Sequence, residues 1–182
     1  MQKAIGMIEY KTVSAGVLAA DQMVKTADVE ILEAQTVCPG KYIALIAGDL
    51  SAVNAAVERA KHTRPEEMIG SFVLGNPDES IFPAIYGTSH VEKMSALGIL
   101  ETYDAASLIV AADIAAKTAI VELIELRIAK GMCGKSYVML TGDVAACEAA
   151  IAKAKAAAGE SGMFLDSSVI AHPDPKICRT II

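Results

Sequence analysis

The chain carries the stretch Ala4-Ile5-Gly6-Met7-Ile8-Glu9 near its beginning and the similar stretch Ala96-Leu97-Gly98-Ile99-Leu100-Glu101 near its middle. Further pairs follow in the same order in both halves, at a spacing of about 92 to 96 residues. They are Ala19-Ala20-Asp21 and Ala111-Ala112-Asp113, Lys25-Thr26-Ala27 and Lys117-Thr118-Ala119, Val29-Glu30 and Val121-Glu122, Gly40-Lys41 and Gly134-Lys135, Gly48-Asp49 and Gly142-Asp143, and Pro77-Asp78 and Pro173-Asp174. A repeat of this length is a whole small domain, so the chain consists of two copies of one domain.

The repeat predicts a first domain over residues 1–86, a linker over residues 87–94 and a second domain over residues 95–182. Each of these domains is large enough to bury a core of its own. Hydrophobic residues make up 53% of the chain and the mean hydropathy is +0.42, although aromatic residues are few. We therefore expect that the chain buries apolar surface against other chains as well as in its own core.

Charge and motif content disfavour several functional classes. The net charge of −6, without any run of Lys and Arg, argues against binding to nucleic acid. No apolar stretch approaches the roughly 20 residues of a membrane-spanning helix, and the first residues lack the apolar core of a signal peptide, so we expect a cytosolic protein without a membrane partner. The sequence has no P-loop, dinucleotide-binding glycine motif or nucleophile elbow, and its histidines share no metal-ligand spacing. We assign no catalytic residue and expect that the protein is not an enzyme.

Apolar periodicity and turn residues predict the same order of elements in both copies. In the first copy, strands are expected at residues 3–10, 29–37, 41–47 and 69–75, with helices from about residue 12 to 26 and from 51 to 62 and a short helix after Asn76-Pro77-Asp78. In the second copy, strands are expected at 96–103, 121–129, 135–141 and 163–170, with helices at 105–118 and 144–157 and a short terminal helix. The order β-α-β-β-α-β predicts an α+β fold of the ferredoxin-like type, with helices on one face of an antiparallel sheet.

Several of these motifs together resemble the bacterial microcompartment (BMC) shell domain. They are Ala4-Ile5-Gly6-Met7-Ile8-Glu9, the run Ala19-Ala20-Asp21-Gln22-Met23-Val24-Lys25-Thr26-Ala27, the turn Pro39-Gly40-Lys41 and the helix start Gly48-Asp49-Leu50-Ser51-Ala52-Val53. Both halves match in the unpermuted order, over nearly the whole chain. The resemblance implies two tandem BMC domains in a structural shell protein. It also implies a homotrimer that forms a pseudohexameric tile beside other shell proteins, in a microcompartment shell within the cytoplasm. Lys25 and Lys117 match a lysine that lies at the tile edge in this family.

The segment Thr36-Val37-Cys38-Pro39-Gly40-Lys41 is similar, more narrowly, to tandem shell proteins of propanediol-utilisation compartments. In those proteins the matching cysteine lies at the central pore, where three copies hold one 4Fe–4S cluster. The resemblance implies that Cys38 is a metal ligand and that electrons cross the shell, with enclosed redox enzymes as further partners. A three-fold axis makes a three-thiolate site from one cysteine per chain, and such a cluster accepts three protein thiolates. The pore loop would contain Val37, Pro39, Gly40 and Lys41 from the first copy and Met132, Cys133 and Gly134 from the second.

Other interpretations of the same residues stay open. Cys38 could be a bare thiol in a cluster-free tile whose pore conducts small metabolites, and Cys133 is either an additional ligand or a thiol in a loop. A third class is a pair of ferredoxin-like domains that binds a small ligand or catalyses a reaction. Cys147 and Cys178 are predicted to be buried, because Cys147 lies in the expected helix 144–157 at a position suited to packing and Cys178 matches Phe82 in the repeat. Glu9 and Glu101 are interpreted as duplicated structural positions.

Overall fold

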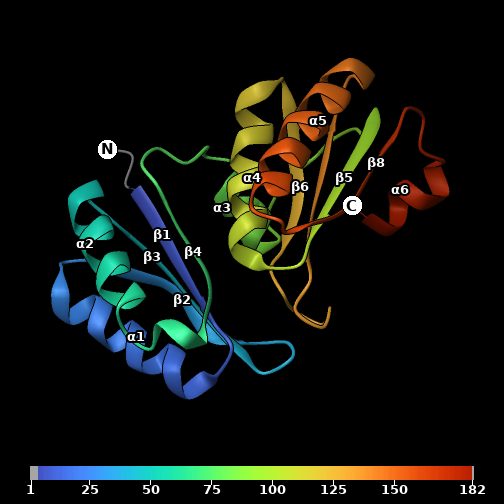
Figure 1. Ribbon diagram of the computed structural model, residues 1–182. Coiled ribbons are helices and arrows are strands. Elements are labelled where there is room, and N and C mark those ends of the chain that lie inside the picture. Colours follow the sequence, from blue (N-terminus) through green and yellow to red (C-terminus); the bar gives the residue numbers. More distant parts are fainter. Residues whose placement is uncertain (1–3, 182) are drawn as a thin grey trace. The chain divides into compact units, whose positions relative to one another are not determined.

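The computed structural model describes residues 4–181 of the chain (Figure 1). The first repeat contains β1 (Ala4–Tyr10), α1 (Val13–Thr26), β2 (Glu30–Val37), β3 (Lys41–Gly48), α2 (Leu50–Lys61), the 3-10 helix η1 (Pro65–Glu67), β4 (Met68–Leu74) and α3 (Ile81–Tyr86). The second repeat contains β5 (Ala96–Thr102), α4 (Ala105–Thr118), β6 (Val121–Arg127), β7 (Ser136–Gly142), α5 (Val144–Glu160), β8 (Phe164–Ile170) and α6 (Pro175–Ile181). The predicted α+β fold with a β-α-β-β-α-β order in each repeat is confirmed.

Each repeat forms one four-stranded antiparallel sheet. The strand orders are β2-β3-β1-β4 and β6-β7-β5-β8, so the first strand of each repeat lies between its third and fourth strands. The sheets also share their irregularities, because the pairing register shifts between Glu9 and Tyr10 in one and between Glu101 and Thr102 in the other. The duplication recognised in the sequence therefore extends to details of strand pairing.

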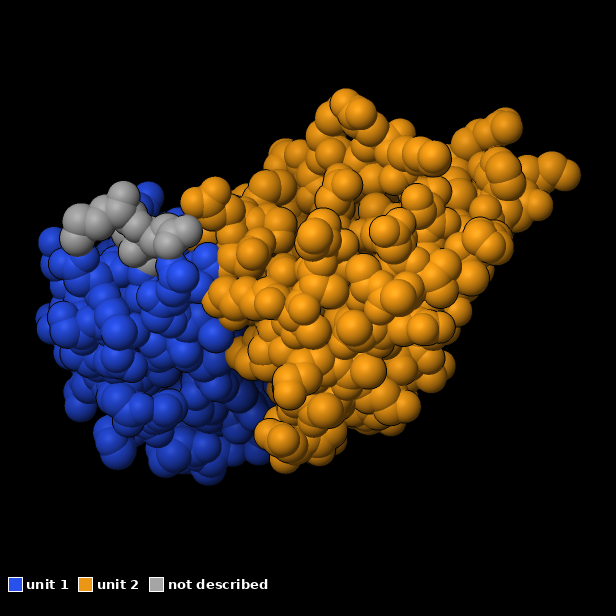
Figure 2. All heavy atoms as spheres, turned by 90° about the horizontal axis from the view of Figure 1, so that it is seen from above, with its two compact units in different colours: residues 1–77, 104–106, 129–134 blue, residues 78–103, 107–128, 135–182 orange. Residues whose placement is uncertain are grey.

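Packing divides the chain into two compact units, which Figure 2 colours separately. Unit 1 contains the chain through Pro77 together with residues 104–106 and 129–134, and unit 2 contains residues 78–103, 107–128 and 135–182. The units do not follow the repeat, because short segments of the second repeat belong to unit 1 and α3 belongs to unit 2. The domain boundaries after residues 86 and 94 stay a prediction.

A glycine in the central strand of each sheet permits close packing of a helix. A Cβ atom on Gly6 would lie 2.7 Å from Cγ1 of Val53 in α2, and one on Gly98 would lie 2.9 Å from Cγ1 of Ile151 in α5. Real Cβ contacts are longer than this, so a larger side chain would push the helix away from its strand. The Gly in both Ala-x-Gly motifs is thus a packing requirement of this fold.

Most differences from the sequence prediction lie at element ends. Strand β6 ends at Arg127 and not at residue 129, because Ala129 has a φ of 55°, which an extended strand does not allow. The helix η1 was not predicted, and the expected start of β1 at residue 3 lies outside the described residues. Cys147 is fully buried, as predicted, and burial raises the pKa of its thiol. Cys178 is only half-buried, which corrects its prediction, because no residue of the short helix α6 is fully buried.

The hydroxyl of Tyr10 should make the stability of unit 1 decrease at alkaline pH. Its hydroxyl lies 2.6 Å from the backbone oxygens of Ala60 and of Thr63, and burial, with a smaller effect of Glu66, raises its pKa from 10.0 to about 12. The unfolded chain therefore loses this proton at lower pH than the folded chain, and the stabilisation is complete below pH 10 and lost as pH rises towards 12. Between pH 9 and 12, chemical denaturation should show that the free energy of unfolding declines less in Tyr10→Phe than in the wild type. Equal declines in the two proteins would contradict this assignment.

Candidate functional site

The candidate pore loop begins where β2 turns into β3. Val37 is buried, Cys38 is half-buried, and Pro39 and Gly40 are exposed. The backbone N–H of Gly40 donates to the oxygen of Val37 at 2.9 Å and closes the turn, with Gly40 at a φ of 102° that favours glycine. The Cys38–Pro39 peptide bond is cis. Cys38 therefore lies in a turn at the end of a strand pair, and part of the residue is accessible.

The second predicted part of the pore loop lies in unit 1 beside Cys38. The backbone N–H of Cys38 donates to the oxygen of Ala129 at 3.1 Å. An ideal Cβ on Gly134 would lie 3.0 Å from Nζ of Lys41 and 3.2 Å from the oxygen of Cys38, so this buried glycine allows close approach of the two loops. Lys130 forms an ion pair with Glu33 of β2 at 2.7 Å. Residues 37–41 and 129–134 thus form one local structure within unit 1.

Cys133 belongs to the same local structure, although its side chain is exposed. Its φ is 52°, in the left-handed region, and Gly131 and Gly134 beside it also have positive φ values. Met132 is half-buried. Neither the ligand nor the non-ligand interpretation of Cys133 is tested by this geometry, and the choice stays a prediction.

The side chain of Lys41 is held by a buried carboxylate. Its Nζ donates to Oε1 of Glu9 at 2.9 Å, and the Glu9 side chain has no exposed surface. The second oxygen of Glu9 accepts the backbone N–H of Ala105 at 2.9 Å. Each oxygen of this buried charge therefore has a partner, which is the condition for keeping an ionised carboxylate in a protein core.

Three contacts were not predicted from the sequence: this ion pair, the bond of Ala129 to Cys38 and the ion pair of Lys130 with Glu33 of β2. The repeat contained a signal for the pair, since both Glu9 and Lys41 return, as Glu101 and Lys135. Because Glu9 joins β1 to β3 through its side chain, its interpretation as a structural position agrees with the observed contacts.

Within residues 4–181, no group of three or more His, Cys, Asp or Glu side chains lies close enough to hold a metal ion. One chain therefore presents single thiols and no complete metal site in its described part. Thiolate sulfur is the donor that iron–sulfur clusters use, and the accessible Cys38 supplies one such donor per chain. The side chains present fit such a cluster only when several chains contribute.

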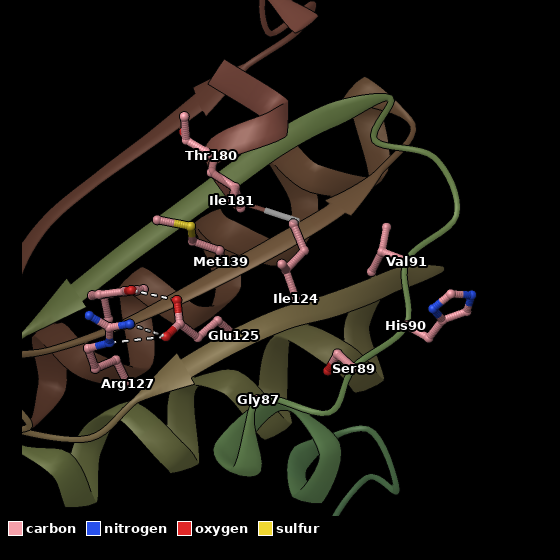
Figure 3. A pocket seen from close by; sticks show the side chains of 11 residues that line it. Gly87, Ser89, His90, Val91, Ile124, Glu125, Arg127, Met139, Thr180 and Ile181 are labelled. Atoms are coloured by element: carbon pink, nitrogen blue, oxygen red, sulfur yellow. Dashed lines mark hydrogen bonds and ion pairs between the residues drawn. The ribbon is translucent and has the colours of Figure 1, made fainter. Parts of the chain in front are cut away.

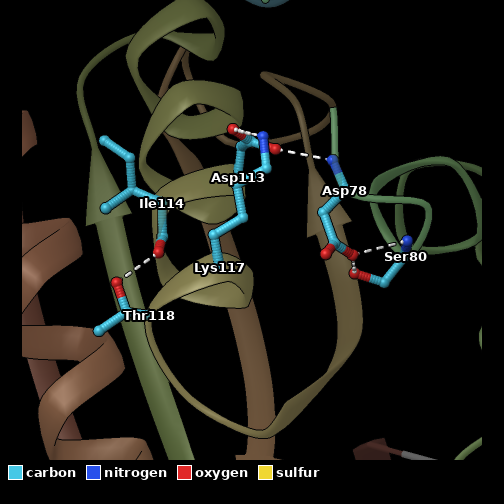
Figure 4. A network of polar contacts seen from close by, with 6 residues as sticks. All are labelled: Asp78, Ser80, Asp113, Ile114, Lys117 and Thr118. Carbon is cyan, nitrogen blue, oxygen red and sulfur yellow. Dashed lines mark hydrogen bonds and ion pairs between the residues drawn. The ribbon is translucent and has the colours of Figure 1, made fainter. Parts of the chain in front are cut away.

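Each predicted tile-edge lysine forms an ion pair with an aspartate four residues earlier in the same helix. Lys25 pairs with Asp21 and Lys117 pairs with Asp113, each at 2.7 Å, near the end of α1 and α4. Asp113 also accepts the backbone N–H of Asp78 at 2.7 Å (Figure 4). The side chain of Lys25 is 67% exposed. The role of both lysines at a tile edge stays a prediction.

Unit 2 has a cavity of about 720 Å³, lined by Val91, Ile124 and Met139 on its apolar side (Figure 3). Three of its polar side chains, those of Glu125, Arg127 and Tyr137, bond to one another. Arg127 donates to Glu125 at 3.0 and 2.7 Å, and the Tyr137 hydroxyl donates to Glu125 at 2.5 Å. Burial, followed by the bond to Glu125, raises the pKa of Tyr137 to about 12. These groups satisfy each other, so the cavity does not indicate a particular ligand.

Comparison with known proteins identifies the fold family. The BMC domain model matches residues 4–77 and again residues 96–173. The chain is 37% identical, over its full length and 99% of the relative, to the bacterial microcompartment shell protein PduT of Citrobacter freundii. The crystal structure of a microcompartment protein from Desulfitobacterium hafniense has 44% identity and a TM-score of 0.87, covering 98% of this chain and 99% of that one.

Among the described helices, none combines the length and the apolar character of a membrane span.

A more distant structure shares the fold alone. The fused permuted hexameric shell protein of the RMM microcompartment has 22% identity and a TM-score of 0.64, covering 87% of this chain and 82% of that one. The repeated match, together with the duplicated sheet and the full-length similarity, shows that this chain belongs to the BMC domain family of bacterial microcompartment shell proteins, with two BMC domains in tandem.

Proposed function

We propose that three copies of this chain form a pseudohexameric tile of a microcompartment shell, with a 4Fe–4S cluster at the central pore. Cys38 of each copy would supply one thiolate, which accounts for three of the four irons. The observation that carries the proposal is the accessible Cys38 in the turn between β2 and β3, in a chain of full-length similarity to PduT. The tile would adjoin other shell proteins in the shell.

The residues around Cys38 would position the thiol and shape the pore. Pro39 restricts the backbone next to the thiol, and the contact of Cys38 with Ala129 ties the turn to the loop of residues 129–134. When bound, a 4Fe–4S cluster supplies one-electron redox chemistry. We infer that the tile transfers electrons across the shell to or from enclosed redox enzymes, and that the chain catalyses no reaction of its own.

The second candidate is a cluster-free tile whose pore conducts small metabolites. In this candidate Cys38 would be a bare thiol in the turn between β2 and β3. The two candidates share the fold, the trimer and the shell location, and they differ in what occupies the pore.

Iron and sulfide content separates the two candidates. The wild-type chain should be purified without oxygen or reconstituted with iron and sulfide, and its mass measured in solution. We expect a brown protein with the mass of three chains and about four irons and four sulfides per trimer, with the optical and magnetic spectra of a 4Fe–4S cluster. A colourless trimer after reconstitution would reject the cluster and leave the metabolite-conducting tile.

A further inference from the structure

Equivalent positions of the two repeats differ in burial, and one such pair is Asp113 and Asp21. Asp113 has 6% of its side chain exposed and accepts both Lys117 Nζ and the backbone N–H of Asp78 in unit 2 (Figure 4). Asp21 has the same lysine partner, Lys25, but 43% of its side chain is exposed. In the repeat, the backbone N–H of Asp174 corresponds to that of Asp78.

A second difference concerns the short helices that end the repeats. In unit 2, α3 packs on β6, and both Ile81 of α3 and Leu123 of β6 are buried, with 0% and 3% exposure. The repeat places Ile177 of α6 at the position of Ile81, and Ile31 of β2 at the position of Leu123. Ile177 is 51% exposed and Ile31 is 45% exposed. Two apolar side chains whose counterparts in the repeat are buried are therefore accessible on this chain.

A third difference concerns the carboxylates of β1 and β5. Glu9 is buried and accepts the N–H of Ala105, which is itself buried. The equivalent carboxylate Glu101 is only half-buried, and Val13, which corresponds to Ala105, is 39% exposed. The three differences agree in direction. In each case the accessible counterpart of a buried contact consists of one group from the second repeat and one from the first. The pairs are α6 with β2, Asp174 with Asp21, and Glu101 with Val13.

We propose that a second copy of this chain completes these three contacts, which deepens the proposed trimer and rests on it. Helix α6 of one copy packs on β2 of the next copy, where Ile177 meets Ile31. The N–H of Asp174 donates to Asp21 of that next copy, and Glu101 accepts its Val13 N–H. The contact is head-to-tail, because it uses different surfaces of the two copies, and such contacts form closed rings when the rotation between copies permits.

The test places a charge on either side of the apolar contact in the full-length chain. Ile31→Asp and Ile177→Asp should each leave the fold intact, because both side chains are accessible, and each should lower the solution mass from three chains to one at micromolar concentration. The control is Ile120→Asp, which changes a side chain that is 96% exposed and lies outside the proposed contact. The control should retain the trimer mass.

Mixing the two variants tests the direction of the contact. The Ile31→Asp chain keeps an intact α6 and the Ile177→Asp chain keeps an intact β2, so one good contact remains possible between them. An equimolar mixture should form a 1:1 complex with the mass of two chains, whereas each variant alone stays at one. Trimers in both variants, or a mixture that stays at one chain, would overturn this contact while leaving the cluster proposal standing. A monomeric wild type would overturn both.

Milder variants keep the test valid if an aspartate prevents folding. Ile31→Thr and Ile177→Thr retain a branched side chain and should weaken the trimer at least about tenfold in its dissociation midpoint, because each removes apolar area from the contact. An unchanged midpoint in both variants would contradict the proposed contact.

Discussion

Replacing Cys38 by alanine should remove all of the iron and sulfide that the wild-type protein binds. If each chain supplies one thiolate, the substitution removes all three of these protein ligands of the cluster at once. The loss should therefore be complete, while the mass of the oligomer stays unchanged, because Cys38 is half-buried in a turn and contributes little packing. Iron and sulfide assays after anaerobic reconstitution, with solution mass on the same samples, measure both effects.

Cys133→Ala is the matched control for this prediction. Cys133 is exposed in the loop beside Cys38, so its alanine variant should keep the wild-type iron and sulfide content if it is only a loop thiol. A proportional loss of iron in this variant would make Cys133 an additional ligand. Full iron content in Cys38→Ala would reject the proposed ligand and the electron-transfer function built on it.

Lys41→Met should be the most destabilising polar substitution within residues 37–41 and 129–134. The substitution leaves Glu9, which has no exposed surface, with the Ala105 N–H but without its cation. Removing one partner of a buried ion pair costs about 3–5 kcal/mol in free energy of unfolding, and we expect the lower end because Lys41 retains 16% exposure. Chemical denaturation at fixed protein concentration and neutral pH measures the change.

Two further variants identify the cause of that loss. Lys61→Met removes a surface lysine that is 41% exposed in its pair with Glu58, and it should change stability little. Adding Glu9→Gln to Lys41→Met should recover part of the loss, since a neutral amide can still accept the Ala105 N–H and leaves no uncompensated charge. If the double variant is as unstable as the sum of the two single variants, the pair is not coupled and the assignment is wrong.

The repeat predicted the fold well because the physical requirements of each domain are local. The Gly of Ala4-Ile5-Gly6 and of Ala96-Leu97-Gly98 sits where a helix must approach a central strand, and the turn residues mark the strand ends. Errors occurred where tertiary contacts override a pattern. An apolar run continues past Arg127, yet the backbone at Ala129 leaves the strand and its oxygen accepts the N–H of Cys38.

Sequence and structure contributed different parts of the candidate site. Cys38 and its turn were predictable from sequence, because Cys-Pro-Gly-Lys is a contiguous motif. The contacts of the Glu9 carboxylate with Lys41 and Ala105 were not predictable. These two partners are separated from Glu9 by 32 and 96 positions in the sequence. A charge without a partner is costly in free energy only where it is buried, and burial is a property of the packed chain and not of a motif.

The sequence by itself determined that this chain holds two copies of a BMC domain, since the same order of strand, helix and turn motifs occurs twice along the sequence. Only the tertiary structure decided which copies of the repeated residues are buried. Asp113 is enclosed whereas Asp21 is accessible, and Leu123 is covered whereas Ile31 is not. The reason is that residues of nearly identical local sequence differ only in their neighbours in space, and those neighbours come from chain segments far away in sequence.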